Sequence, residues 1–281
     1  MEIQRKRVIR VCFGLITSLS INMAAFGQPD APGFVIEDYA HVQQPDKLAF
    51  SPGGILYVGT HRSSARIYRI GIGGSPIEEY GDTLLGGPDA VVFDAGGAIS
   101  GVAGSVLVGD VGDLVAILPD ETTVPLLSIP GNISHLVFDR ATRLLMNDTD
   151  GFKLWATTGE PPLQLGDGFD GLTVDGANRI YSSFVSGQVQ VREPNGTRLP
   201  DLLPPDDLGI FDGLAFGPFD PIWKGELFAS ARSTVYRIGP DGSLEVFATG
   251  FVDTSDAEFG PDGALYVVDS AVDTIYRISP N

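Results

Sequence analysis

Phe169-Asp-Gly-Leu-Thr-Val174 and Phe211-Asp-Gly-Leu-Ala-Phe216 are two copies of one phrase, an aromatic residue followed by Asp-Gly and a short apolar run. We count the phrase from its Asp, or from a Ser in the same place, to the apolar residue four positions later. Counted in this way, it recurs at Asp46 to Phe50, Asp89 to Phe93, Ser134 to Phe138 and Ser255 to Phe259. The first residues of the six phrases lie 43, 45, 36, 42 and 43 residues apart. A period of this length is typical of solenoids and propellers, in which each repeat is one supersecondary unit.

Each phrase is followed by further short apolar segments. After the phrase that begins at Asp212 these are Leu227-Phe-Ala229, Thr234-Val-Tyr-Arg-Ile238 and Leu244-Glu-Val-Phe-Ala248. Such segments are rich in Val, Ile, Tyr and Phe, are separated by Gly, Pro, Asn and Asp, and show no long helical period. Four antiparallel strands in each repeat form the blade of a propeller. We therefore expect an all-β, six-bladed β-propeller with four strands in each blade.

The sixth repeat shows only three such strands before Asn281. Val35 to Phe50 and Leu244 to Phe259 are both 16 residues long and align without a gap, which places Val35-Ile-Glu-Asp-Tyr39 over a fourth strand. We expect residues 34–40 to form the outer strand of the last blade and so close the ring, which removes an exposed sheet edge. A β-sandwich shares the composition but gives no reason for the repeat.

The first 27 residues have the pattern of an export signal. Four basic residues precede an apolar stretch from Val11 to Phe26, and Ala25-Phe26-Gly27 fits a cleavage site. Polar residues interrupt this stretch, so it is a poor membrane span, and no later segment approaches the roughly 20 apolar residues that a span needs. We expect residues 1–27 to be removed, residues 28–281 to form one propeller domain, and the protein to be a secreted or periplasmic monomer without membrane insertion.

Cysteine and charge exclude several classes of function. Cys12, the single cysteine, lies in the expected signal, which leaves no residue for disulfides, cysteine-ligated zinc or a thiol nucleophile. Without residues 1–27, Lys and Arg fall from 18 to 14 and Asp and Glu from 36 to 35, so the net charge is −21. Such a surface repels nucleic acid and anionic lipid and favours hard cations, Ca²⁺ above all. Acidity that serves only solubility is the alternative.

The residues that open the six phrases are the candidates for a binding site. The first strand of every blade lines the central channel of a propeller, so Asp46, Asp89, Asp170 and Asp212 are expected to meet at one rim. Four like charges repel unless they are protonated, solvated or bridged by a cation, and Ca²⁺ with its 6 to 8 oxygen ligands is the simplest remedy. We predict a metal site there, with turn capping by each single Asp as the open alternative.

A second row of polar residues ends the second strands: Asp110, Asp148 with Asn147 beside it, and Asp269. We favour loop-starting roles for Asp110 and Asp269. His61 and His135 are expected near the channel mouth, where a general base is useful, although a loop histidine is often only solvated. His135 and Asp148 are our candidate catalytic residues. The sequence has no Gly-x-Ser-x-Gly elbow.

Phe259-Gly-Pro-Asp-Gly-Ala-Leu-Tyr-Val-Val-Asp-Ser270, with Ile275-Tyr-Arg-Ile278 after it, resembles the blade text of a six-bladed propeller superfamily. This superfamily contains regucalcin, gluconolactonases, strictosidine-synthase-like proteins and NHL-repeat proteins. The resemblance covers nearly all of residues 28–281, but its motif is shared by propellers of several functions. Gluconolactonase-like members hold Ca²⁺ or Zn²⁺ through a Glu that opens the first blade, Asn residues that open later blades, and an Asp that ends a second strand and acts as the base.

By position, the resemblance implies Asp46 for the Glu, Asp170 and Asp212 for the Asn residues, and Ala231 for the base. It implies a bound divalent cation, with Ca²⁺ favoured over Zn²⁺. It also implies a small lactone, ester or sugar-like ligand, which the protein binds or acts on as a metal-dependent lactonase or esterase-like hydrolase. Asp148 or His135 would have to replace the base. A non-catalytic NHL-like scaffold for an extracellular protein or glycan is the alternative, and a short quinone-dependent sugar dehydrogenase is the third.

Overall fold

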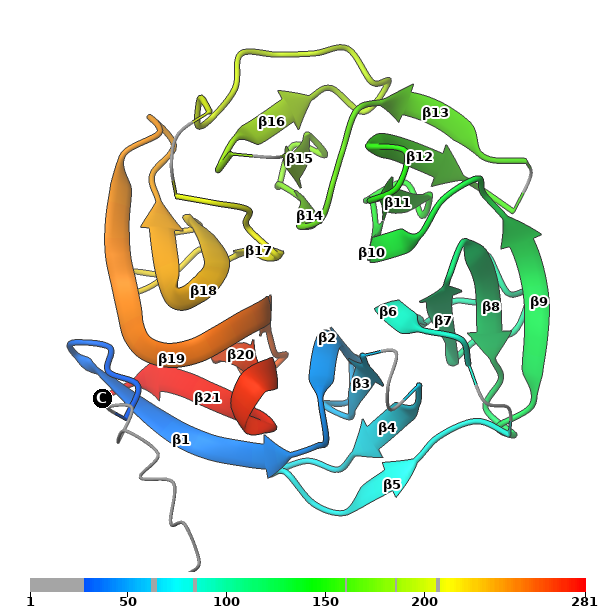
Figure 1. Ribbon diagram of the computed structural model, residues 1–281, viewed down its shortest axis with the longest axis horizontal. Helices are drawn as coiled ribbons and strands as arrows, with labels where there is room; N and C mark the ends of the chain where they lie inside the picture. Colours follow the sequence, from blue (N-terminus) through cyan, green and yellow to red (C-terminus); the bar gives the residue numbers. More distant parts are fainter. Residues whose placement is uncertain (1–27, 62–64, 83–84, 160, 185, 206–207) are drawn as a thin grey trace, which may run out of the picture.

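The computed structural model describes residues 28–61, 65–82, 85–159, 161–184, 186–205 and 208–281. The expected export signal, residues 1–27, lies outside them. Strands arranged around a central axis make up the described part of the chain (Figure 1), which contains no α-helix and one short 3₁₀ turn, Ser270–Val272. The prediction of an all-β propeller is therefore confirmed.

Hydrogen bonds join the strands into five sheets. The first contains β2 (Pro45–Phe50), β3 (Leu56–Thr60), β4 (Ile67–Ile70) and β5 (Ile77–Glu79). The second contains β6 (Pro88–Asp94), β7 (Ser105–Asp110), β8 (Asp113–Ile117) and β9 (Thr123–Ser128). The third contains β10 (Ile133–Phe138), β11 (Leu144–Asp148), β12 (Lys153–Thr157) and β13 (Leu163–Gly166). The fourth contains β14 (Leu172–Val174), β15 (Ile180–Ser183) and β16 (Val189–Arg192). The fifth contains, in spatial order, β1 (Phe34–His41), β21 (Thr274–Pro280), β20 (Leu265–Asp269), β19 (Leu244–Phe259), β18 (Leu227–Ile238) and β17 (Gly213–Phe216).

The prediction of six separate blades is wrong, because the structure has five when each hydrogen-bonded sheet counts as one blade. The cause is β19, which runs through 16 residues without a break. Its first half pairs with β18 and its second half with β20, with Thr254 bonded in both registers. The last two sequence repeats are thereby joined into one six-stranded sheet.

The prediction of four strands in each blade also fails in the fourth sheet. Its β16 is followed by an irregular segment that pairs with it through the isolated bridges Val189↔Leu203 and Arg192↔Arg198 and through scattered backbone hydrogen bonds, such as that from Leu199 N to Val191 O. Pro200, Pro204 and Pro205 fall in this segment, and proline cannot donate a ladder hydrogen bond. The segment therefore lies beside β16 without forming a regular outer strand.

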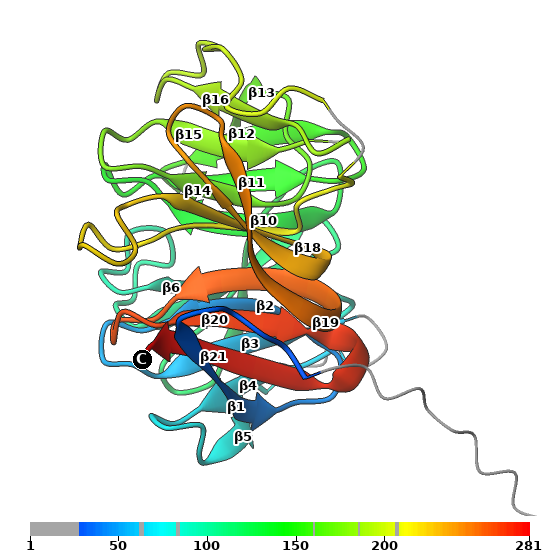
Figure 2. The same ribbon diagram turned by 90° about the vertical axis from the view of Figure 1, so that its left-hand side faces the viewer.

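Closure of the ring by the N-terminal strand is confirmed. β1 pairs antiparallel with β21 from Phe34↔Pro280 to His41↔Thr274, so that the beginning and the end of the described chain lie side by side (Figure 2). The predicted span, residues 34–40, differs from the observed strand by one residue.

The core lies between neighbouring sheets. The second strands β3, β11 and β20 are buried at every position, because both faces of an inner strand pack against another sheet. One cluster joins Leu48 and Val58 of the first sheet to Val268 and Ile275 of the fifth. This packing brings β2, β6, β10, β14, β17 and the end of β19 to the central axis (Figure 1). In the described ranges, no helix has the length and apolar character needed to cross a membrane.

Candidate functional site

All six residues that open the repeated phrase line one pocket. This pocket has a volume of about 230 Å³, and its lining contains Asp46, Asp89, Ser134, Asp170, Asp212 and Ser255. Lys47, His61, Asn132 and Thr149 complete the lining. The predicted convergence of Asp46, Asp89, Asp170 and Asp212 on one rim is therefore found.

β-bulges direct four of these side chains to the rim. The register of β2 with β3 shifts between Pro45 and Lys47, so that Asp46 is the extra, unpaired residue. The same shift falls at the corresponding positions of β6, β10 and β19, namely at Asp89, Ser134 and Ser255. A bulge bends its strand and re-aims one side chain, so these four residues leave the alternation of the sheet. Asp170 and Asp212 stand just before β14 and β17.

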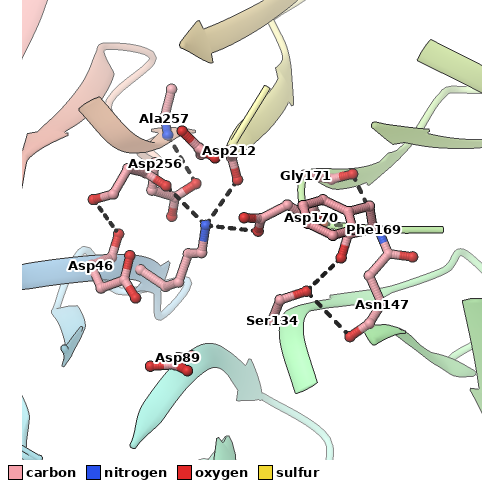
Figure 3. Close-up of polar contacts among 12 residues, drawn as sticks. Asp46, Asp89, Ser134, Asn147, Phe169, Asp170, Gly171, Asp212, Asp256 and Ala257 are labelled. Atoms are coloured by element: carbon pink, nitrogen blue, oxygen red, sulfur yellow. Dashed lines mark hydrogen bonds and ion pairs between the residues drawn. The ribbon is translucent and has the colours of Figure 1, made fainter. Parts of the chain in front are cut away.

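An ammonium group occupies the middle of the rim (Figure 3). Lys47 is 4% exposed, and its Nζ donates to Oδ1 of Asp170 at 3.1 Å. The same atom donates to the main-chain oxygens of Asp212 and Ser255, each at 2.8 Å. An ammonium group has three N–H donors, so these three acceptors use all of them. Lys47 therefore has no donor left for a ligand.

Smaller contacts fix the rim around Lys47. Ser255 Oγ donates to the main-chain oxygen of Asp46 at 3.0 Å. Asn132 Nδ2 donates to Oδ2 of Asp89 at 2.9 Å, and Asn147 Nδ2 donates to the main-chain oxygen of Asp170 at 2.8 Å. Each of these bonds joins segments of neighbouring sheets, so the rim is held between sheets as well as within each sheet.

Burial shifts the ionisation of the rim carboxyl groups. Loss of hydration raises the pKa of Asp46 to about 7, against an opposing effect of the Lys47 charge. Burial, followed by the charge of Asp170, raises the pKa of Asp212 to about 8. Burial also raises the pKa of Asp170, although Lys47 opposes this shift. Carboxyl groups that titrate near neutral pH can give or take a proton, and such groups concentrate at functional sites.

Asp256 forms a deeper layer beneath the rim. Burial raises its pKa to about 6, against the charge of Lys47. Its oxygens accept the backbone N–H of Leu48 at 2.8 Å and of Ala257 at 2.9 Å. Burial lowers the pKa of Lys47, but the nearby carboxylates, led by Asp170, outweigh burial and raise it above its ordinary value. The side chain is therefore a permanent cation at physiological pH.

The oxygen atoms at the centre of the rim are not arranged for a divalent cation. The place where such an ion would contact Asp170 and the neighbouring carbonyl oxygens is held by Lys47 Nζ. Over the described residues, no group of three or more His, Cys, Asp or Glu side chains is arranged to hold a metal ion. Binding of Ca²⁺ or Zn²⁺ by Asp46, Asp89, Asp170 and Asp212 stays a prediction.

The two candidate catalytic residues do not line the pocket. His135 is 9% exposed, and burial, followed by the Lys47 charge, lowers its pKa well below the ordinary value. Asp148 is fully buried, and its Oδ1 accepts the backbone N–H of Asp150 and Gly151, each at 2.9 Å. Their catalytic roles stay predictions, and His61 is the histidine that lines the pocket.

Asp110 and Asp269 have the loop roles that we favoured. Oδ1 of Asp110 accepts the backbone N–H of Gly86 and Gly87, each at 2.7 Å. The carboxylate of Asp269 accepts the backbone N–H groups of Val252 and Asp253. Ala231, at the place of the implied base, is buried in an apolar cluster.

Sequence reasoning missed Lys47 and Asp256, although the repeats contain a signal for both. The position after each phrase-opening residue holds, in chain order, Lys47, Ala90, His135, Gly171, Gly213 and Asp256. Two ionised residues of opposite charge stand out at a position where three repeats have Gly or Ala. Comparison of the repeats at this second position would have singled out Lys47 and Asp256 as buried charges near the axis.

The structure resembles solved propellers of several functions. Neither a protein-family model nor a curated protein sequence matches the chain. A gluconolactonase from Xanthomonas campestris is 13% identical, with a TM-score of 0.70 over 88% of this chain and 89% of the other. An auxiliary nutrient binding protein from Bacteroides thetaiotaomicron is 9% identical, with a TM-score of 0.69 over 88% and 76%.

The PQQ domain of a pyranose dehydrogenase from Coprinopsis cinerea is 12% identical, with a TM-score of 0.68 over 90% of this chain and 97% of the other. These neighbours differ in function, so the likeness shows the fold alone. The likeness therefore shows that the chain has a β-propeller fold, which the gluconolactonase among these structures shares.

Proposed function

We propose that the chain binds a small, neutral, hydroxyl-bearing lactone or ester in the rim pocket and hydrolyses it with the rim carboxyl groups. The observation that carries this proposal is the convergence of all six phrase-opening residues on one pocket, where Asp46 and Asp212 titrate near neutral pH. The structural likeness to gluconolactonases agrees with the ligand class.

The pocket suits a ligand of about one ring. Its volume of about 230 Å³ equals that of about seven to eight water molecules in the liquid, at about 30 Å³ each. Carboxylate oxygens accept hydrogen bonds from the hydroxyl groups of a sugar-like molecule. Two larger hollows, of about 690 and 770 Å³, contain none of the phrase-opening residues, so the smaller pocket is the better candidate.

The proposed hydrolysis uses Asp46 as base and Asp212 as acid. Ionised Asp46 takes a proton from water, and the water oxygen forms a bond to the lactone carbonyl carbon. Protonated Asp212 gives its proton to the ring oxygen as the C–O bond breaks, which yields one hydroxy acid from one lactone and one water. Asp46 then releases its proton and Asp212 regains one from solvent. The product ionises, and the acidic protein, with a net charge of −18, favours its release.

The predicted divalent cation has no part in these steps, because Lys47 holds the centre of the rim. Export remains part of the proposal: we propose that residues 1–27 direct the protein to the periplasm or the medium. Recovery of a protein that begins at Gln28 from either fraction would support it, and recovery of the full chain only from the cytoplasm would contradict it.

A hydrolysis screen with sugar-derived lactones and aryl esters tests the function. General acid–base catalysis contributes about 10²- to 10⁴-fold, so Asp46→Asn and Asp212→Asn should each lower kcat by a factor in that range. Glu245→Gln, which removes an exposed carboxyl group on β19, is the matched control and should leave kcat unchanged. Absence of turnover and of ligand binding by the wild type would instead favour the scaffold for an extracellular protein or glycan.

A further inference from the structure

The contacts of Lys47 have the chemistry of a hard-cation site. One carboxylate oxygen and two main-chain carbonyl oxygens surround Nζ at 2.8 to 3.1 Å. Carboxylate and carbonyl oxygens are the ligands that Ca²⁺ uses in proteins, at 2.3–2.6 Å. Here the same kinds of oxygen accept hydrogen bonds from N–H groups, and the occupant is a side chain of the protein.

This ammonium joins four repeats across the channel. Lys47 is 123 residues from Asp170, 165 from Asp212 and 208 from Ser255 along the chain. Two of its bonds go to main-chain oxygens, so it fixes the backbone at the phrase-opening residues Asp212 and Ser255.

The charge balance of the rim needs a cation at this point. Asp46, Asp89, Asp170 and Asp212 line the pocket, in which Lys47 is the one Lys or Arg among the described lining residues, and Asp256 lies beneath them. Like charges in one site raise one another's pKa and repel when ionised. A centrally placed positive charge reduces this repulsion for every carboxylate around it.

We infer that the Lys47 ammonium group is the built-in cation of the propeller rim, which replaces a bound metal ion and positions Asp170, Asp212 and Ser255 around the pocket. A divalent cation cannot share this place, because it would stand against the ammonium charge and compete for oxygens that already accept its hydrogen bonds. The inference concerns the architecture of the rim and does not rest on the proposed hydrolysis. A wild type without turnover would leave it intact.

Thermal unfolding of the purified wild type and of Lys47→Ala, each with chelator, with Ca²⁺ and with propylammonium, tests the inference. Propylammonium replaces the atoms that Lys47→Ala removes beyond Cβ. The Tm of the wild type should not change with Ca²⁺ or chelator. Lys47→Ala should have a lower Tm that rises in a saturable way with propylammonium or Ca²⁺, because a ligand held only by the native state stabilises it.

Lys153→Ala is the matched control, because Lys153 Nζ pairs with an exposed carboxylate, Asp167, at 3.0 Å. Its Tm should respond to neither ligand. A saturable gain in Tm by the wild type with Ca²⁺ would overturn the inference. So would a Lys47→Ala protein whose Tm is unchanged, or is lowered and restored by neither ligand.

If Lys47→Ala does not fold, Lys47→Met and the double variant Lys47→Met/Asp170→Asn replace it. The double variant removes both charges of the pair at 3.1 Å, so its Tm should exceed that of Lys47→Met. A double variant no more stable than Lys47→Met would show that the ion pair plays no part, and the inference would be wrong.

Discussion

Lys47→Met should lower the free energy of unfolding by about 3 kcal/mol at pH 8. The substitution keeps the length of the side chain but removes three hydrogen bonds and the partner of Asp170. Breaking a buried ion pair by removing one partner costs about 3–5 kcal/mol. The Asp170 side chain is 18% exposed, so water can hydrate the remaining carboxylate in part, and the lower end of this range applies.

Differential scanning calorimetry measures this loss as a change in Tm. For a protein of about 150–250 residues, 1 kcal/mol corresponds to about 2–4 °C, so Tm should fall by about 6–12 °C. At pH 5 the fall should be smaller. Burial raises the pKa of Asp46, Asp170 and Asp212, so these groups are more protonated at that pH, and the variant then leaves less unpaired negative charge. Lys153→Met is the control. A fall below about 2 °C at pH 8, or an equal fall at both pH values, would refute the reasoning.

Three further predictions concern pH and space. The wild type should be less stable at pH 9 than at pH 5 by urea unfolding, because Asp46 and Asp212 have folded-state pKa values of about 7 and about 8. Groups with a raised folded-state pKa stabilise the protein below their unfolded pKa and lose this contribution as pH rises through the folded value; equal stability at both pH values would contradict the raised values. If hydrolysis is found, kcat should follow a bell-shaped curve with its maximum between about pH 7 and 8, since Asp46 must be ionised and Asp212 protonated, whereas a flat profile would exclude this assignment. Gly213→Ala should lower Tm, because the added Cβ would lie 2.4 Å from Ala257 N and 2.6 Å from Asp256 Oδ1. The control Gly53→Ala should leave Tm unchanged, because its Cβ would meet no atom closer than 3.9 Å. Equal Tm values for the two variants would show that the backbone around Gly213 shifts to make room.

The ring arrangement could be predicted because it follows from local sequence patterns that recur along the chain. The Asp-Gly phrase and the strands after it repeat at nearly constant spacing, and the alignment of Val35 to Phe50 with Leu244 to Phe259 located the closing strand. The strand β1 pairs with β21 as that alignment requires. The convergence of the four Asp residues followed from the same repeat, since equivalent positions in a ring of repeats meet at the axis.

The sheet count could not be predicted, because it depends on how far one strand continues. Gly250 interrupts the apolar pattern of residues 244–259 and suggests a loop, yet β19 passes through it as one strand. Gly250 has a φ of +92°, which a glycine adopts without strain. The strand therefore bends there without ending, and two repeats share one sheet.

The occupant of the rim was missed for a different reason. The four Asp residues predict a need for positive charge, but local sequence does not say whether a metal ion or a distant side chain meets it. Lys47 follows Asp46 directly, and two neighbours on a regular strand point to opposite faces. The bulge at Asp46 breaks this alternation, so that both residues line the pocket.

The position of Lys47 Nζ in a crystal grown in the presence of Ca²⁺ tests the central claim most directly. We predict that Nζ lies within hydrogen-bonding distance of Asp170 Oδ1 and of the main-chain oxygens of Asp212 and Ser255, with no ion among them. A structure in which the Lys47 side chain turns away and Ca²⁺ binds these oxygens in its place would contradict the account.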